Sequence, residues 1–140
     1  MVRYYSEDIK FNFKGRRANN KWLSGVASAE SKKLGELNVI FCSDPHILEM
    51  NRKYLGHDYY TDIITFDYCE GNLLSGDLFI SVDTVRDNSS FYGASFDEEI
   101  HRVIVHGLLH LIGYDDGTAE EKKMMREKED YYLSLRERFS

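Results

Sequence analysis

The sequence is poor in cysteine and proline and has no long hydrophobic run. Its 140 residues include two cysteines and one proline. Cys42 and Cys69 lie in strand-like segments and are not spaced as a pair of metal ligands, so we expect two buried, reduced thiols. No stretch approaches the roughly 18 apolar residues that a membrane-spanning helix needs, and the charged first residues contain no apolar signal core. These absences predict a cytoplasmic protein with no membrane partner.

The composition predicts one folded domain spanning residues 1–140. Hydrophobic residues make up 42% of the chain and aromatic residues 14%, which is enough to build a core and excludes a disordered protein. The net charge of −6 argues against a protein that binds nucleic acid over its whole surface. Basic residues gather in the first quarter of the chain, where they form either a phosphate-facing surface or the solvated side of a helix: Arg3, Lys10, Lys14, Arg16, Arg17, Lys21, Lys32 and Lys33.

The most informative segment runs from His106 to Asp116. Two histidines four residues apart on a helix face the same way, so His106 and His110 can bind one metal ion. Gly113 allows the helix to end and the chain to turn back, and Asp116 then arrives ten residues after the first histidine. We therefore predict a metal site formed by His106, His110 and Asp116, with Asp115 as the alternative third ligand.

The same spacing occurs in zinc metalloproteases of the pattern H-E-x-x-H-x-x-G-x-x-H. In those enzymes the glutamate beside the first histidine accepts a proton from the metal-bound water. Gly107 stands at that position here and cannot do so, whereas Asp116 stands at the third histidine and remains an acceptable zinc ligand. The pattern therefore keeps the ligands of a zinc protease without its base and favours a different hydrolysis.

The remaining segments predict an α+β fold, with a mixed four-stranded sheet, about five helices, and the metal site on one helix and the turn after it. We expect strands at 2–5, 36–42, 62–68 and 77–82, with a turn at 71–76 before the last of them. We expect helices at 17–32, 44–54, 82–91, 96–112 and 119–138. Ser43 or Asp44 caps the second helix, and Thr118 with Glu121 forms a capping box before the last.

Three blocks of this sequence resemble the YbeY family of bacterial rRNA-maturation endoribonucleases. The first is His106-Gly-Leu-Leu-His-Leu-Ile-Gly-Tyr-Asp115, and the others are Thr61-Asp62-Ile-Ile-Thr-Phe66 and Gly76-Asp77-Leu-Phe-Ile-Ser81. The resemblance implies one zinc ion per chain, held by His106, His110 and Asp116. It also implies cleavage of single-stranded RNA during 16S rRNA 3′-end maturation and ribosome quality control, with the small ribosomal subunit as partner.

Two positions depart from the family pattern. The family usually has a histidine where Asp116 stands, and an arginine after the Tyr54 position, where this chain has Leu55. An arginine would bind a phosphate in bidentate fashion, and Arg52 or Lys53 is a candidate replacement on the same helix.

The sequence also suggests residues that act beside the metal. Asp77 is a candidate proton acceptor, with capping of the turn after Gly76 as its alternative role, and Thr61 and Asp62 are expected to support the site and contact substrate. Two other functions remain open. One is a non-catalytic ribosome-assembly factor in which zinc ties a helix to a loop, and the other is a small metallopeptidase.

Overall fold

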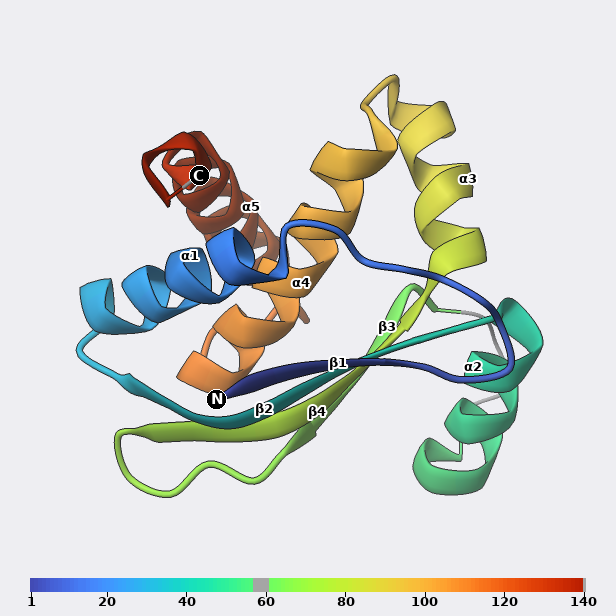
Figure 1. Cartoon of the computed structure of the whole chain (residues 1–140). Helices are drawn as coiled ribbons and strands as arrows, with labels where there is room; N and C mark the ends of the chain where they lie inside the picture. Colours follow the sequence, from blue (N-terminus) through green and yellow to red (C-terminus); the bar gives the residue numbers. More distant parts are fainter. Residues whose placement is uncertain (57–60, 140) are drawn as a thin grey trace.

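The sheet determines where every other element lies (Figure 1). The computed structural model describes residues 1–56 and 61–139. Its strands are β1 (Val2–Ser6), β2 (Lys33–Cys42), β3 (Ile63–Asp67) and β4 (Leu73–Ser81), arranged in the order β1-β2-β4-β3. The pairs β1–β2 and β2–β4 are parallel, whereas β3 runs antiparallel to β4. The predicted mixed four-stranded sheet is therefore confirmed for the part of the chain that the structure describes.

Five α-helices connect and cover these strands within the described ranges. They are α1 (Arg16–Ala29), α2 (Asp44–Met50), α3 (Val82–Tyr92), α4 (Phe96–Ile112) and α5 (Ala119–Ser134). A π-helical turn, Asn51–Leu55, extends α2, and a 3-10 turn, Arg136–Phe139, follows α5. Ser43 caps α2 by accepting a hydrogen bond from the backbone of His46, and the predicted capping box opens α5. The α+β class with five helices is thus confirmed.

The alternation of side chains along the strands creates two unequal hydrophobic layers. On β4, Leu78 and Ile80 belong to the main core beneath α1, α3, α4 and α5. Phe79 points to the other face, where it packs with Ile47 of α2 and Ile64 of β3. Figure 1 shows the larger group of helices on one side of the sheet and α2 near the end of the other. The central helix α4, which carries both histidines, therefore lies directly on the sheet.

Two strands begin earlier than the sequence indicated. β4 starts at Leu73 rather than at residue 77, and β2 starts at Lys33 rather than at residue 36. The two early segments pair with each other, with Lys33 opposite Leu73 and Leu34 opposite Leu74. The predicted turn at 71–76 is consequently shorter, and Gly76 lies within β4 opposite Leu37. Glycine at position 76 is typical of a turn, but pairing with the distant strand β2 places it inside β4.

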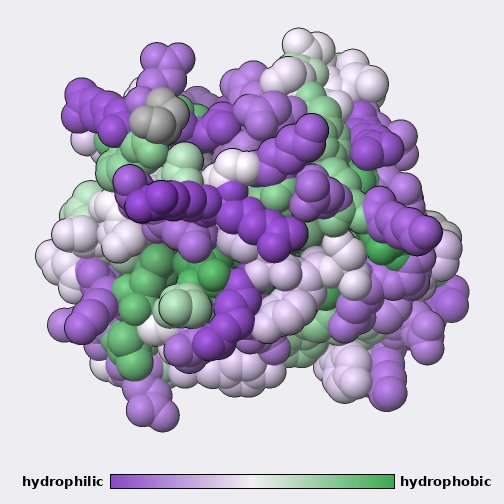
Figure 2. All heavy atoms as spheres, viewed as in Figure 1, coloured by the Kyte–Doolittle hydropathy of each residue, from purple (hydrophilic) through white to green (hydrophobic). Residues whose placement is uncertain are grey.

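The distribution of hydrophilic residues on the surface is consistent with a hydrophobic core enclosed by the sheet and helices. On the face shown in Figure 2, hydrophilic residues predominate and hydrophobic groups appear in narrower areas between them. None of the helices in residues 1–56 and 61–139 is long and apolar enough to cross a membrane.

Candidate metal centre

The helix α4 positions two histidines through its own regular geometry. Ser95 caps the helix by accepting a hydrogen bond from the backbone of Glu98, and the acidic first turn suits the positive end of the helix dipole. His106 and His110 lie one turn apart at the edge of the buried stripe, and both are half-buried. Their Nε2 atoms face each other at 3.0 Å. The spacing from which we predicted one shared metal ion therefore brings both imidazoles to one point.

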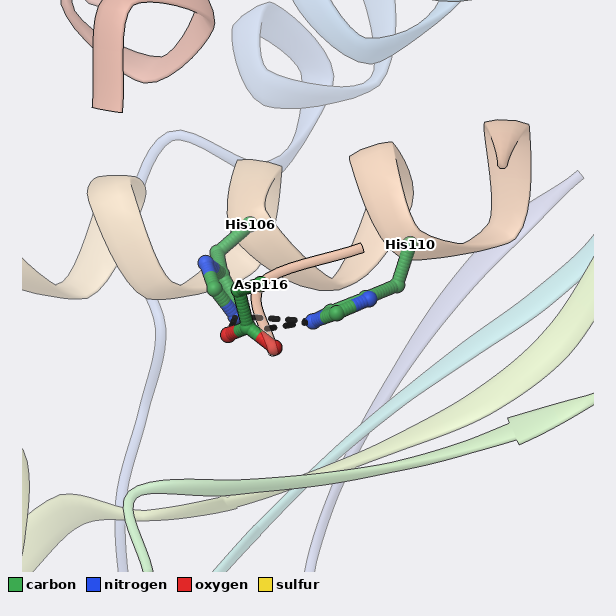
Figure 3. A group of neighbouring side chains, drawn as sticks. All are labelled: His106, His110 and Asp116. Atoms are coloured by element: carbon green, nitrogen blue, oxygen red, sulfur yellow. Dashed lines mark hydrogen bonds and ion pairs between the residues drawn. The ribbon is translucent and has the colours of Figure 1, made fainter. Parts of the chain in front are cut away.

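The loop after α4 brings a carboxylate to the same point (Figure 3). α4 ends at Gly113, whose φ of 127° lies in the region that glycine adopts readily, and the chain turns back. The Oδ2 atom of Asp116 lies 3.3 Å from Nε2 of His106 and 3.5 Å from Nε2 of His110. Asp115 is exposed and lines a different hollow. Of the two candidate carboxylates, the structure thus brings Asp116 to the histidines.

These three residues form a group that could hold a metal ion, because their ligand atoms all lie within 4.8 Å of one another. Two imidazole nitrogens and one carboxylate oxygen are an accepted ligand set for catalytic zinc, which keeps a further position for water or substrate. The donor set therefore fits a zinc ion, although zinc is one of several divalent ions that imidazole and carboxylate ligands bind.

Glu129, on α5, holds His106 in the orientation that metal binding needs. Its Oε2 atom lies 2.7 Å from Nδ1 of His106, and its Oε1 atom accepts a hydrogen bond of 2.9 Å from Arg102. The Glu129 side chain is buried, so Arg102 supplies the charge that compensates it. A carboxylate that accepts from one ring nitrogen leaves the other nitrogen free for a metal, as in carboxylate–histidine–zinc arrangements.

Sequence reasoning missed Glu129 and Arg102. Arg102 lies one turn before His106 on α4, but its partner comes from another helix and is 27 residues away. The available signal was a glutamate in line with Met125 and Tyr132 on the buried side of α5. A charged residue at a core position indicates a buried partner without identifying it.

The carboxylates around the cluster alter the pKa values of neighbouring groups. Burial alone would lower the pKa of His106, but the hydrogen bond and charge of Glu129, together with Asp62 and Asp116, raise it. Burial raises the pKa of Asp62, an effect that the nearby His106 partly offsets. In the metal-free protein this environment stabilises positive charge at the position where a metal cation would bind.

An open cleft of about 510 Å³ lies over the cluster. Its lining combines the three candidate ligands with residues of the π-helical turn, β3, the loop before β3 and the end of α4: Leu55, Thr61, Asp62, Ile63, Ile64, Thr65, Asp67, His106, His110, Leu111 and Asp116. Thr61 and Asp62 thus line the same cleft as the candidate metal ligands. No lysine or arginine of the described residues lines this cleft.

The absence of a glutamate at position 107 has a packing explanation. Gly107 is buried where α4 crosses the sheet. A Cβ atom there would lie 2.8 Å from Cδ1 of Ile63 and 2.9 Å from Cδ2 of Leu78, closer than side chains normally approach. The position faces the sheet, so a longer side chain would displace core residues of β3 and β4.

Comparison with known proteins places this arrangement in a family. The model of the family described as Endoribonuclease YbeY matches residues 2–136. The chain belongs to the YbeY endoribonuclease family. A protein named endoribonuclease YbeY from Bacteroides thetaiotaomicron is 53% identical over 135 residues, covering 96% of this chain and 98% of that protein. A relative of the same name from Parabacteroides distasonis is 51% identical over 134 residues, covering 96% of this chain and 94% of that protein.

A solved structure shows a similar fold at greater sequence distance. The solution structure of a Thermotoga maritima protein matches this chain with a TM-score of 0.68 and 28% identity. The match covers 97% of this chain and 89% of the other. The match of the family model to residues 2–136 confirms the resemblance of the sequence to the YbeY family over nearly its whole length.

The structure does not bring Asp77 or Arg52 to the cluster. Asp77 lies within β4 and accepts a hydrogen bond of 2.9 Å from Asn38, on the face opposite Leu78 and α4. It neither caps a turn nor lies beside the histidines, because β4 begins earlier than expected. Arg52 is exposed on the π-helical turn and does not line the cleft, whereas Leu55 does.

Proposed function

We propose that this protein is a zinc-dependent endoribonuclease that cleaves single-stranded RNA during 16S rRNA 3′-end maturation and ribosome quality control. The observation that carries the proposal is the convergence of His106, His110 and Asp116 at the floor of an open cleft. The names of the YbeY relatives support RNA as the substrate. The proposal includes a cytoplasmic location and the small ribosomal subunit, or its proteins, as the partner that presents the precursor rRNA.

In this proposal the three ligands hold one zinc ion. Bound zinc would lower the pKa of a water molecule and polarise a phosphoryl oxygen of the RNA. Glu129 keeps Nδ1 of His106 occupied, so that Nε2 stays directed at the ion. Asp77 is not part of this proposal, because its carboxylate is bound to Asn38 on the other face of the sheet.

The cleft walls suggest how RNA is bound. Leu55, which is 46% exposed, offers apolar surface for a base or the carbon atoms of a ribose, and Thr61 and Asp62 offer polar groups for hydroxyl or amino groups. No described lysine or arginine lines the cleft. We therefore propose that the bound metal would neutralise the negative charge of the scissile phosphate. Arg52 lies outside the cleft. We propose that it binds another phosphate of the RNA, further along the RNA strand.

One observation favours a second candidate function, that of a non-catalytic zinc-containing assembly factor. Leu55 lines the cleft, and the resemblance to the family pattern implies an arginine at this position. A leucine cannot bind a phosphate, so the cleft lacks a charge that would help to stabilise the transition state of cleavage. In this alternative, zinc joins α4 to the following loop and RNA is bound without being cut.

Cleavage of a precursor 16S rRNA 3′-end fragment by the zinc-loaded full chain separates the two. We expect the wild type to cut the fragment and a folded His110→Ala variant to leave it intact. Equal background from both proteins, with zinc bound by the wild type alone, would reject the nuclease and support the assembly factor. Circular dichroism of both proteins confirms that the comparison is between folded chains.

A further inference from the structure

A partly buried carboxylate outside the cleft receives three hydrogen bonds. Glu30 follows the last residue of α1, and its side chain is only 11% exposed. It accepts hydrogen bonds from the hydroxyl of Tyr114 at 2.6 Å, from Nζ of Lys128 at 3.1 Å, and from the hydroxyl of Tyr132. Because its three donors lie at least 84 residues away along the chain, this carboxylate links separate parts of the fold.

The donors come from two segments, and one of them carries a candidate metal ligand. Lys128 and Tyr132 belong to α5, whereas Tyr114 lies in the loop between α4 and α5, two residues before Asp116. Figure 1 shows α1 and α4 ending on the same side of the molecule, which is where Glu30 and this loop meet. The Tyr114 ring packs partly buried against the core, with Nζ of Lys128 5.4 Å from its centre.

The ligand loop is therefore held on both sides of Asp116. On one side Tyr114 is bonded to Glu30, and its backbone N–H donates to the carbonyl of Leu109. On the other side Thr118 is fixed by the capping box of α5. Asp116 itself contacts the two imidazoles and is 44% exposed, so its position follows from the loop rather than from a packed environment of its own.

We propose that Glu30 is a positioning residue for the third metal ligand, acting through Tyr114. Because Glu30 holds the loop in place in the absence of metal, less conformational entropy of Asp116 is lost when the ion binds. The inference rests on the metal site of the proposed function and adds a residue 86 positions away from the ligand that it positions. Groups that orient metal ligands typically change metal affinity by about 10- to 100-fold when they are removed.

Two tyrosines that share one carboxylate provide a matched comparison. Tyr114→Phe removes the bond from the ligand loop to Glu30, and Tyr132→Phe removes a bond from α5 to the same carboxylate. Both changes keep the aromatic ring. Zinc dissociation constants of the full chain, measured by competition with a chromogenic chelator, should rise about 10-fold for Tyr114→Phe and stay within about 2-fold of wild type for Tyr132→Phe.

A double-mutant cycle tests whether Glu30 influences zinc affinity through Tyr114. If Glu30 acts through Tyr114, then Glu30→Ala combined with Tyr114→Phe should bind zinc no more weakly than Glu30→Ala alone. Urea unfolding of the metal-free variants measures stability separately, and loss of stability without loss of affinity is expected for Tyr132→Phe. Should Glu30→Ala fail to fold, the comparison of the two tyrosine variants decides the question.

The outcomes distinguish this inference from the function on which it rests. A wild type that binds no zinc overturns both. A wild type that binds zinc, with Tyr114→Phe binding equally well, overturns the role of Glu30 and leaves the metal site intact. Equal weakening by Tyr114→Phe and Tyr132→Phe also overturns it, because the carboxylate would then act through general stability.

Discussion

The glycine next to the first histidine provides a sharp test of the packing argument. Gly107 lies in the middle of α4, where alanine would favour the helix by about 1 kcal/mol. The added methyl group, however, would lie 2.8 Å from Ile63 and 2.9 Å from the fully buried Leu78. Forcing an extra carbon into a packed core costs about 1–3 kcal/mol. We therefore expect Gly107→Ala to destabilise the protein by about 1 kcal/mol.

The chain contains a matched control in another helix. A Cβ atom at Gly25, in α1, would lie 2.7 Å from Cζ of Phe139, which is as close as the contacts at Gly107. Phe139 is partly exposed in the short turn that follows α5, so its ring can move aside. Gly25→Ala should therefore gain helix propensity with little packing cost and be as stable as wild type or about 0.5–1 kcal/mol more stable.

Thermal and urea unfolding of both variants, followed by circular dichroism in the presence of a chelator, measure the difference without a contribution from bound metal. The expected gap of about 1–2 kcal/mol corresponds to midpoints roughly 3–8 °C apart for a domain of this size. If Gly107→Ala is as stable as Gly25→Ala, close packing of α4 on the sheet does not explain the glycine. The position would then be open to side chains, including the base of a zinc protease.

Three further results are expected. Glu129→Gln should weaken zinc binding about 10- to 100-fold in chelator competition with the fold intact, and unchanged affinity would show that Glu129 does not orient His106. Thr118→Ala should lose about 1 kcal/mol of unfolding free energy in urea, and no loss would mean that the capping box is not needed by α5. Burial would raise the pKa of Glu30, but its three donors outweigh this and lower it, so its stabilising charge is present above pH about 4.5 and lost as the pH falls further. Urea unfolding of metal-free wild type and Glu30→Gln should accordingly show a stability difference that is constant at neutral pH and shrinks below pH about 4.5; a difference that grows with acid would contradict it.

Local patterns were sufficient to predict much of this molecule. The helix of the metal site was expected at 96–112 and is found at Phe96–Ile112, because capping, hydrophobic periodicity and a terminal glycine are all encoded nearby in the sequence. The convergence of His106, His110 and Asp116 follows from the same local rules. These features depend on residues within about three helical turns of one another.

The features that were mispredicted or missed depend on distant segments. Asp77 was expected at the start of a strand, but pairing between Leu73 and Lys33 lengthens β4 and places Asp77 within it, bonded to Asn38. Glu129 was missed because its partners lie on another helix. A periodic pattern within one helix does not show which charged residue of another helix will contact it. Contacts such as those of Glu129 are therefore seen only in the folded structure.

The placement of charge around the cleft links these distant contacts to function. Asp62, Asp67 and Asp116 line the cleft, no described lysine or arginine does, and Arg102 is already engaged with Glu129. In the metal-free protein the raised pKa of His106 favours its protonated form, which places a positive charge beside these carboxylates. A divalent cation would replace that proton and supply both the missing charge of the cleft and the electrophile for a phosphate. Metal affinity should therefore fall as the pH drops and His106 retains its proton, and RNA cleavage should fall with it.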